Sequence, residues 1–444
     1  MKAGSVCGVL TVSFIIDKWG RKAGLVFCST FSILGSAMCC AAQNPGMFIA
    51  FRFVMGFGSN AFVPTAGIYT SELAPPALRG LFGGLNGALI VVGYSFSSYM
   101  GLAFFHANNP MVQWRTPLGL ALVFPVLTLL LLPVFPESPR WLLMQNRPAE
   151  AEKIVHRLHR DLGNDEFARA EFDLMRRQAE QDKALDSSWR VLFTRASYRK
   201  RAIIVMLIGA LGQLSGVTAI NNFSPLIYST LGYDPQDTLI LLCGWITGGI
   251  FASIIGAWLM DKVGRRPMIL FGFGAVCFCL IVVATMMAVF ATPVPDNPNK
   301  AALGTAVAML YVFIWIFCGT LDDALVVFLP ELFPNHLRAK GMALGIATLD
   351  LTDLVLLQVT PIAMRTIGWK FYLVFISASA VGLIWAFFAI PETRGLPLER
   401  VAALFGEETE PAPTVVADTR VSGAEKESAV EELEYTGPTN ESYV

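Results

Sequence analysis

Four aspartates stand inside long apolar stretches of the C-terminal half of the chain. Asp322 and Asp323 lie in one stretch, and Asp350 and Asp353 lie in the next; neither stretch contains a lysine or an arginine. Four isolated carboxylates in hydrocarbon would cost about 10 kcal/mol on insertion scales, so they cannot all be charged and unpaired. Such acids suit the binding of a proton or of a cationic group on a ligand. Alternatively, they only hydrogen-bond neighbouring helices or line a wet vestibule.

A second group of polar side chains interrupts the apolar stretch Ala202–Thr230. Two glycines and a proline flank them, as expected for a broken helix: Gln213, Thr218, Asn221 and Asn222. Amides both donate and accept hydrogen bonds, so they suit a hydroxyl-rich ligand. Gln213 and Asn221 lie about 80° apart on a helix of 3.6 residues per turn, so both can border one cavity. Alternatively, these residues hold neighbouring helices together.

The stretches that carry these residues are long and apolar enough to cross a bilayer. The chain has 444 residues, of which 54% are hydrophobic and only 15% are charged; about a quarter is usual in soluble domains. A helix needs roughly 20 apolar residues to cross the hydrocarbon core. Eleven segments suit that purpose, the first of them short: Ala3–Ile16, Ala23–Ala42, Met47–Tyr69, Leu81–Phe105, Thr116–Phe135, Ala202–Thr230, Gln236–Met260, Met268–Ala291, Ala302–Leu329, Gly341–Met364 and Phe371–Ile390. The sequence therefore predicts an all-α, multi-pass integral membrane protein.

Basic residues gather in alternate loops, which predicts the orientation of the chain. The loops rich in lysine and arginine, the central polar stretch and the C-terminal tail are expected on the cytoplasmic side. The expected organisation has four parts: a membrane bundle over 1–135, a cytoplasmic linker with short helices over 136–201, a second bundle over 202–390, and an acidic tail over 391–444. Its segment Gly406–Val444 lacks large apolar residues, and the tail is predicted to be disordered.

Composition also excludes several classes of partner. The net charge of −1 gives no reason to expect nucleic acid. The eight cysteines all lie in apolar blocks without metal-type spacing, so neither a metal nor another cofactor is expected. The expected partners are the lipid bilayer and a small polar solute, with or without protons.

Three charged motifs occur twice, in the same order and 244 to 259 positions apart. The copies pair as follows: Asp17–Lys22 with Asp261–Arg266, Glu72 to Arg79 with Glu331 to Arg338, and Pro136–Arg140 with Pro391–Arg394. Repeats in this order imply two similar bundles in parallel orientation, related by an axis along the membrane normal.

Together these motifs resemble the signatures of the sugar porter family of the major facilitator superfamily. Gln213 to Gly216 resembles the family motif that opens the seventh helix, and Phe333 to Gly341 is similar to fungal members. The resemblance runs from Val9 to about Glu399. It implies a transporter that moves a sugar, polyol or cyclic metabolite by alternating access, in the plasma membrane by default, with proton symport as one mode.

The resemblance implies a gating role for the charged loop motifs. Their ion pairs would hold the two bundles together on the cytoplasmic side while the cavity faces outward. Alternatively, the charges only set topology. The candidate gating residues are Asp17, Arg21, Glu72, Arg79, Glu137, Arg140, Asp261, Arg265, Arg266, Glu331, Arg338, Glu392 and Arg394.

The chain departs from the family pattern at the implied solute site. Positions where the family places glutamine, asparagine, tyrosine, glutamine and tryptophan hold other residues: Gly212, Thr218, Asn222, Tyr94 and Val326. These departures disfavour a hexose and favour another polar metabolite. Asp353 falls where the family often places a cavity asparagine, which makes it the leading site residue.

The first half of the chain is expected to be one helix short. Five spans precede the linker and six follow it, whereas the repeat demands six and six, so the first helix of twelve is expected to be missing. Arg52 fits this expectation, since it lies in a span with no acid nearby. In proton-coupled family members the matching arginine pairs with an aspartate on the first helix. Alternatively, Arg52 extends to the membrane interface.

Three other functions compete with transport. A membrane enzyme is disfavoured because no Ser/His/Asp or Cys/His set is evident and the chain has only four histidines. A transporter-like nutrient sensor would use a long cytoplasmic tail, and this tail is short. A non-functional truncated transporter is the third. Solute uptake into cells or liposomes separates these alternatives.

Overall fold

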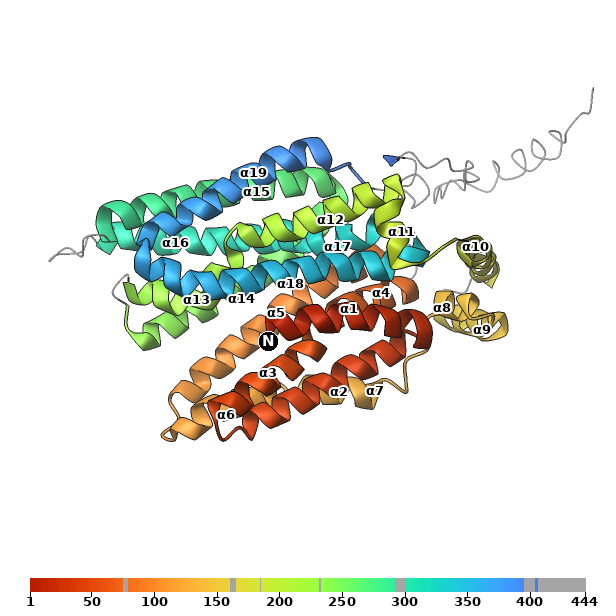
Figure 1. Ribbon diagram of the computed structural model, residues 1–444, viewed down its shortest axis with the longest axis horizontal. Coiled ribbons are helices and arrows are strands. Elements are labelled where there is room, and N and C mark those ends of the chain that lie inside the picture. Colours follow the sequence, from red (N-terminus) through yellow and green to blue (C-terminus); the bar gives the residue numbers. More distant parts are fainter. Residues whose placement is uncertain are drawn as a thin grey trace, which may run out of the picture. The chain divides into compact units, whose positions relative to one another are not determined.

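The computed structural model describes residues 1–74, 79–159, 165–183, 185–230, 233–291, 300–394 and 404–405. Every regular element in these ranges is helical, which confirms the expected all-α class (Figure 1). Most of the expected acidic tail, residues 395–403 and 406–444, lies outside the described residues.

In the described part of the first half, seven helices precede the linker. They are α1 (Lys2–Trp19), α2 (Arg21–Cys40), α3 (Pro45–Ser59), α4 (Phe62–Leu73), α5 (Arg79–Phe105), α6 (Pro110–Leu120) and α7 (Val123–Leu131). Gly20 separates α1 from α2 at φ 98°, a conformation that glycine adopts without steric penalty. The second copy of the motif has the same geometry, since Gly264 takes φ 108° between α14 and α15.

The described linker helices range from 6 to 19 residues, and the two longest described helices, α14 and α18, follow the linker. The linker holds α8 (Pro139–Met144), α9 (Pro148–His159), α10 (Asp165–Lys183) and α11 (Trp189–Thr194). The second half holds α12 (Ala196–Leu214), α13 (Val217–Thr230), α14 (Pro235–Val263), α15 (Arg265–Met286), η3 (Met287–Ala291), α16 (Lys300–Phe317), η4 (Cys318–Asp322), α17 (Asp323–Glu331), α18 (Asn335–Thr366), η5 (Gly368–Lys370) and α19 (Phe371–Ala389).

Ten of the eleven expected spans coincide with helical segments long and apolar enough to cross a membrane within the described residues. The remaining segment is α1, which has 18 residues and includes Lys2, Asp17 and Lys18. These charges lower its mean hydropathy below that of the other spans. Nevertheless α1 packs against α2, α3 and α18, as a membrane helix of the bundle does.

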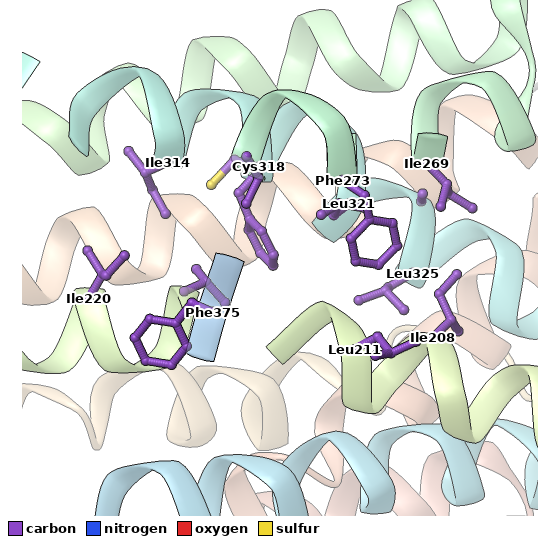
Figure 2. Packing of buried hydrophobic residues seen from close by; sticks show 14 of the residues in the cluster. Ile208, Leu211, Ile220, Ile269, Phe273, Ile314, Cys318, Leu321, Leu325 and Phe375 are labelled. Atoms are coloured by element: carbon purple, nitrogen blue, oxygen red, sulfur yellow. The ribbon is translucent and has the colours of Figure 1, made fainter. Parts of the chain in front are cut away.

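A continuous apolar core holds the second half together. Figure 2 shows Ile208 and Leu211 of α12 near Leu325 of α17, and Phe273 of α15 beside Leu321. All five side chains are buried. Burying such side chains stabilises the helix packing by dispersion contacts, because lipid tails are as apolar as the core itself.

Two seams join the first-half helices to the second-half helices. At one seam α5 lies along α14, and at the other α1 lies along α18 (Figure 1). Helix α4 also contacts α17 and α18. The seams matter for function because residues there are shared by both halves.

Candidate functional site

The motif residues of the first half form a buried network around Glu72. Arg21 donates from Nε and Nη2 to the two Glu72 oxygens, each at 2.8 Å, and Ser138 donates to the same carboxylate. Arg21 also donates to the carbonyl of Ile16 at 2.9 Å. Glu137 accepts the backbone N–H of Arg21 at 3.0 Å, so a carboxylate caps the N-terminus of α2.

The second half repeats this network around Glu331. Arg265 donates from Nη2 to Glu331 at 2.9 Å, and Thr393 donates to the other Glu331 oxygen at 2.8 Å. Glu392 accepts the backbone N–H groups of Arg265 and Arg266 at 3.0 and 3.1 Å, so it caps α15 as Glu137 caps α2. Each described network joins helices of its own half.

The remaining candidate gating residues are placed as follows. Arg140 lines a pocket with Arg21, Glu72, Asp182 and His336. Arg338 is buried, and the backbone N–H of Arg394 donates to Glu392. The side chains of Arg79 and Asp261 lie outside the described residues.

An ion pair crosses between the halves where α1 ends and α18 begins. Asp17 Oδ2 lies 2.6 Å from Lys340 Nζ, and the Lys340 side chain is only 8% exposed. The linker also contacts the second half, since Asp182 Oδ1 of α10 lies 3.2 Å from Nδ1 of His336 at the start of α18. The sequence indicated Lys340 only as one of the basic residues that set the orientation of the chain. Its pairing was not predicted, because its partner, Asp17, is 323 positions away.

Asp350 and Asp353 share a cation that comes from outside their own span. Lys2 Nζ lies 2.8 Å from Asp350 Oδ1 and 2.7 Å from Asp353 Oδ2. Asn60, which follows α3, donates to Asp350 Oδ1 at 2.6 Å. The expected span Gly341–Met364 contains no lysine or arginine, and the neutralising cation comes from α1 across the seam.

The broken helix α12–α13 supplies the other side of this cluster. Thr218 Oγ1 lies 2.6 Å from Gln213 Oε1 and hydrogen-bonds Asp353 Oδ1. A hydroxyl carries one hydrogen, so Thr218 can donate to only one of them. The other contact needs either the Gln213 amide turned to donate or a proton on Asp353. Gln213, Thr218 and Asp353 thus meet in one buried cluster.

Asn221 and Asn222 make only local hydrogen bonds among the described contacts. The Asn222 amide donates to the Thr218 carbonyl, and the Asn221 carbonyl accepts from Ser224. Their side chains are partly or fully exposed, so they remain open to a ligand.

Asp322, Asp323 and Arg52 lie apart from this cluster. Asp323 is 1% exposed and accepts from Ser253 of α14 at 2.6 Å, next to Gly87 of α5. Asp322 ends the π-helical segment η4, a feature frequent at functional sites. Arg52 lies over the Phe48 ring at 4.9 Å, and none of its described contacts reaches an aspartate.

Residues 1–405 match the family model for the sugar (and other) transporters. The chain belongs to this transporter family. Its relatives include the MFS-type transporter criB of Aspergillus cristatus, with 28% identity over 92% of this chain and 83% of the relative. The sugar transporter STL1 of Saccharomyces cerevisiae is 30% identical over 91% of this chain and 71% of the relative.

Solved structures support the same fold. The proton:xylose symporter XylE bound to 6-bromo-6-deoxy-D-glucose aligns with a TM-score of 0.79, covering 91% of this chain and 87% of that chain at 19% identity. The chain is therefore a multi-pass membrane protein of the major facilitator fold, and the resemblance read from the sequence motifs is confirmed.

Proposed function

We propose that this family member carries a small polyhydroxylated solute, a sugar or a polyol, by alternating access of its two halves. The main support is the buried polar cluster of Gln213, Thr218 and Asp353, which Lys2 connects to the first half. Buried polar groups in a membrane are retained where they serve binding or coupling. The name of the relative STL1 supports the solute class.

The chemistry of the cluster suits a ligand with several hydroxyls. Asp353 offers a carboxylate that accepts hydrogen bonds, and Gln213 can both donate and accept. Asn221 and Asn222 add two amides with exposed surface on the same broken helix. A solute hydroxyl that enters between Thr218 and Asp353 can replace their mutual hydrogen bond, so solute binding would change the contacts between α13 and α18.

Uptake in cells that lack their own sugar and polyol transporters tests this function. Radiolabelled pentoses, hexoses, linear polyols, cyclic acids and cationic metabolites form the panel, with surface expression measured for each strain. We expect accumulation of at least one sugar or polyol above the level of empty-vector cells. Uptake of cationic metabolites alone would contradict the solute class, and normal expression with no uptake would favour the sensor or the non-functional reading.

Replacing Lys340 with methionine is expected to favour inward-facing states. The change removes the Asp17–Lys340 pair at the cytoplasmic ends of α1 and α18. Electron–electron distance measurements between labels at Trp19 and Val263, both exposed, should show a longer distance than in the unmodified protein. Lys153→Met, on the exposed face of α9, is the control. Identical distances in both variants would leave Lys340 with a topological role only.

A further inference from the structure

Helices α1 and α18 carry an ion pair near each end of their shared seam, with opposite polarity. On α1, Lys2 lies at the non-cytoplasmic end and Asp17 at the cytoplasmic end, 15 residues or about 22 Å apart. On α18, Lys340 lies at the cytoplasmic end, and the two aspartates that bind Lys2 lie 10 and 13 residues further along, about 15–20 Å. Both ends of the seam are closed in this structure.

The two ends of the seam differ in charge balance. The cytoplasmic end pairs one carboxylate with one ammonium group. The other end places two carboxylates, Asp350 and Asp353, around the single ammonium of Lys2, which leaves one negative charge in excess. Asp350 is 0% exposed, whereas Lys2 keeps a side-chain exposure of 23%, so the excess charge is buried on the α18 side.

The hydrogen bonds at this end also leave one carboxylate oxygen available to bind a proton. Asp350 Oδ1 accepts from Lys2 and Asn60, but Asp350 Oδ2 is buried without a hydrogen-bond partner among the described residues. A buried acceptor without a partner costs about 1–3 kcal/mol, and more when it is charged. A proton on Asp350, or one on Asp353 donated to Thr218, would neutralise the cluster and relieve the excess charge.

We propose that Lys2, Asp350 and Asp353 form an outer gate that takes up one proton from the non-cytoplasmic side each time the gate closes. In the open gate Lys2 is withdrawn and both carboxylates are hydrated and ionised. On closing, the ammonium group returns and one carboxylate oxygen binds a proton from water, so the buried cluster carries no net charge. Because Asp353 also contacts Thr218, the gate would link proton uptake to the solute site; this link rests on the proposed function.

Other titratable or charged groups surround the gate. The α-amino group of Met1 lies within electrostatic range of Lys2, and Arg52 lies within range of that amino group. Tyr94 of α5 lies within range of all three gate residues and of Asp322. The contacting residues Asn60 and Thr218 do not titrate. The acids of the gate itself must therefore be tested by substitution rather than by pH alone.

Distance measurements across the outer ends of the two halves test the gate without any solute. Labels on unnatural amino acids at Gln43 and Thr366, both exposed, report the separation in nanodiscs between pH 5.5 and 8. Uptake of one proton on closing makes the ratio of closed to open protein rise by up to tenfold for each pH unit of acidification. Wild-type protein should therefore shift toward the shorter distance at low pH.

Substitutions identify the groups responsible. Asp350→Asn mimics the protonated acid, so it should stay closed with at most a small response to pH, whereas Lys2→Met should favour the longer distance. Lys153→Met, on the exposed face of α9, should leave the outer distance unchanged, and monodisperse elution is required of every variant. A wild-type pH response retained in both Asp350→Asn and Asp353→Asn, or no response in wild type, would overturn the proposal. Loss of solute uptake with an intact gate response would instead refute only the proposed function.

Discussion

Replacing Glu72 with alanine is expected to lower the free energy of unfolding by about 3–5 kcal/mol, the range for removing one partner of a buried ion pair. Arg21 would keep its charge in a site where its side chain is 10% exposed, and Ser138 would lose its acceptor. Unfolding titrations of the purified protein, followed by tryptophan fluorescence, measure the change.

An exposed ion pair on the same chain provides the matched control. Glu150 lies 2.6 Å from Arg147 on α9, and the two side chains are 52% and 49% exposed. Since solvent screens such pairs, Glu150→Ala should change stability by less than about 1 kcal/mol. Equal losses in the two variants would show that the Arg21–Glu72 pair adds no stability of its own.

Replacing Asp353 with asparagine is expected to lower solute uptake by roughly 10- to 100-fold. The change removes a charged acceptor for Thr218 and one of the two carboxylates that hold Lys2. Hydrogen bonds to charged groups contribute about 1.5–3 kcal/mol, which corresponds to that range of rate or affinity. Initial rates over a range of solute concentrations separate a rise in KM, expected for lost binding, from a fall in maximal rate, expected for impaired gating.

Asp173→Asn is the control for this substitution, since Asp173 is exposed on α10. Uptake by this variant should match wild type when corrected for surface expression. Unchanged kinetics in Asp353→Asn would remove Asp353 from the solute site.

The membrane architecture could be predicted from sequence because its signals are local. The length of an apolar stretch predicts whether it can cross the bilayer. Gly20 and Gly264, each within a copy of the repeated motif, mark the turns between consecutive helices. The partners of Arg21 and Arg265 were also within reach, since each charged motif offers few acids. What the motifs could not show is that each pair lies inside one half of the protein.

The contacts across the seam could not be predicted in this way. Lys2 and Asp350 are 348 positions apart, and only the packing of α1 against α18 brings them together. The π-helical segment η4, which ends at Asp322, also changes the rotation per residue, and a period of 3.6 residues cannot show this. The contact of Asn60 could not be predicted either, because its partner, Asp350, is 290 positions away and only the packing of the helices brings them together.

Solute exchange by the purified protein in liposomes tests transport most directly. Liposomes loaded with one unlabelled sugar or polyol are diluted into the same labelled solute, so that exchange needs no gradient and no other protein. Wild-type protein is expected to accelerate the entry of at least one sugar or polyol well above protein-free liposomes, and Asp353→Asn is expected to exchange it at least tenfold more slowly. Correctly inserted, monodisperse protein that exchanges no solute of the panel would contradict the proposal that this chain is a working transporter.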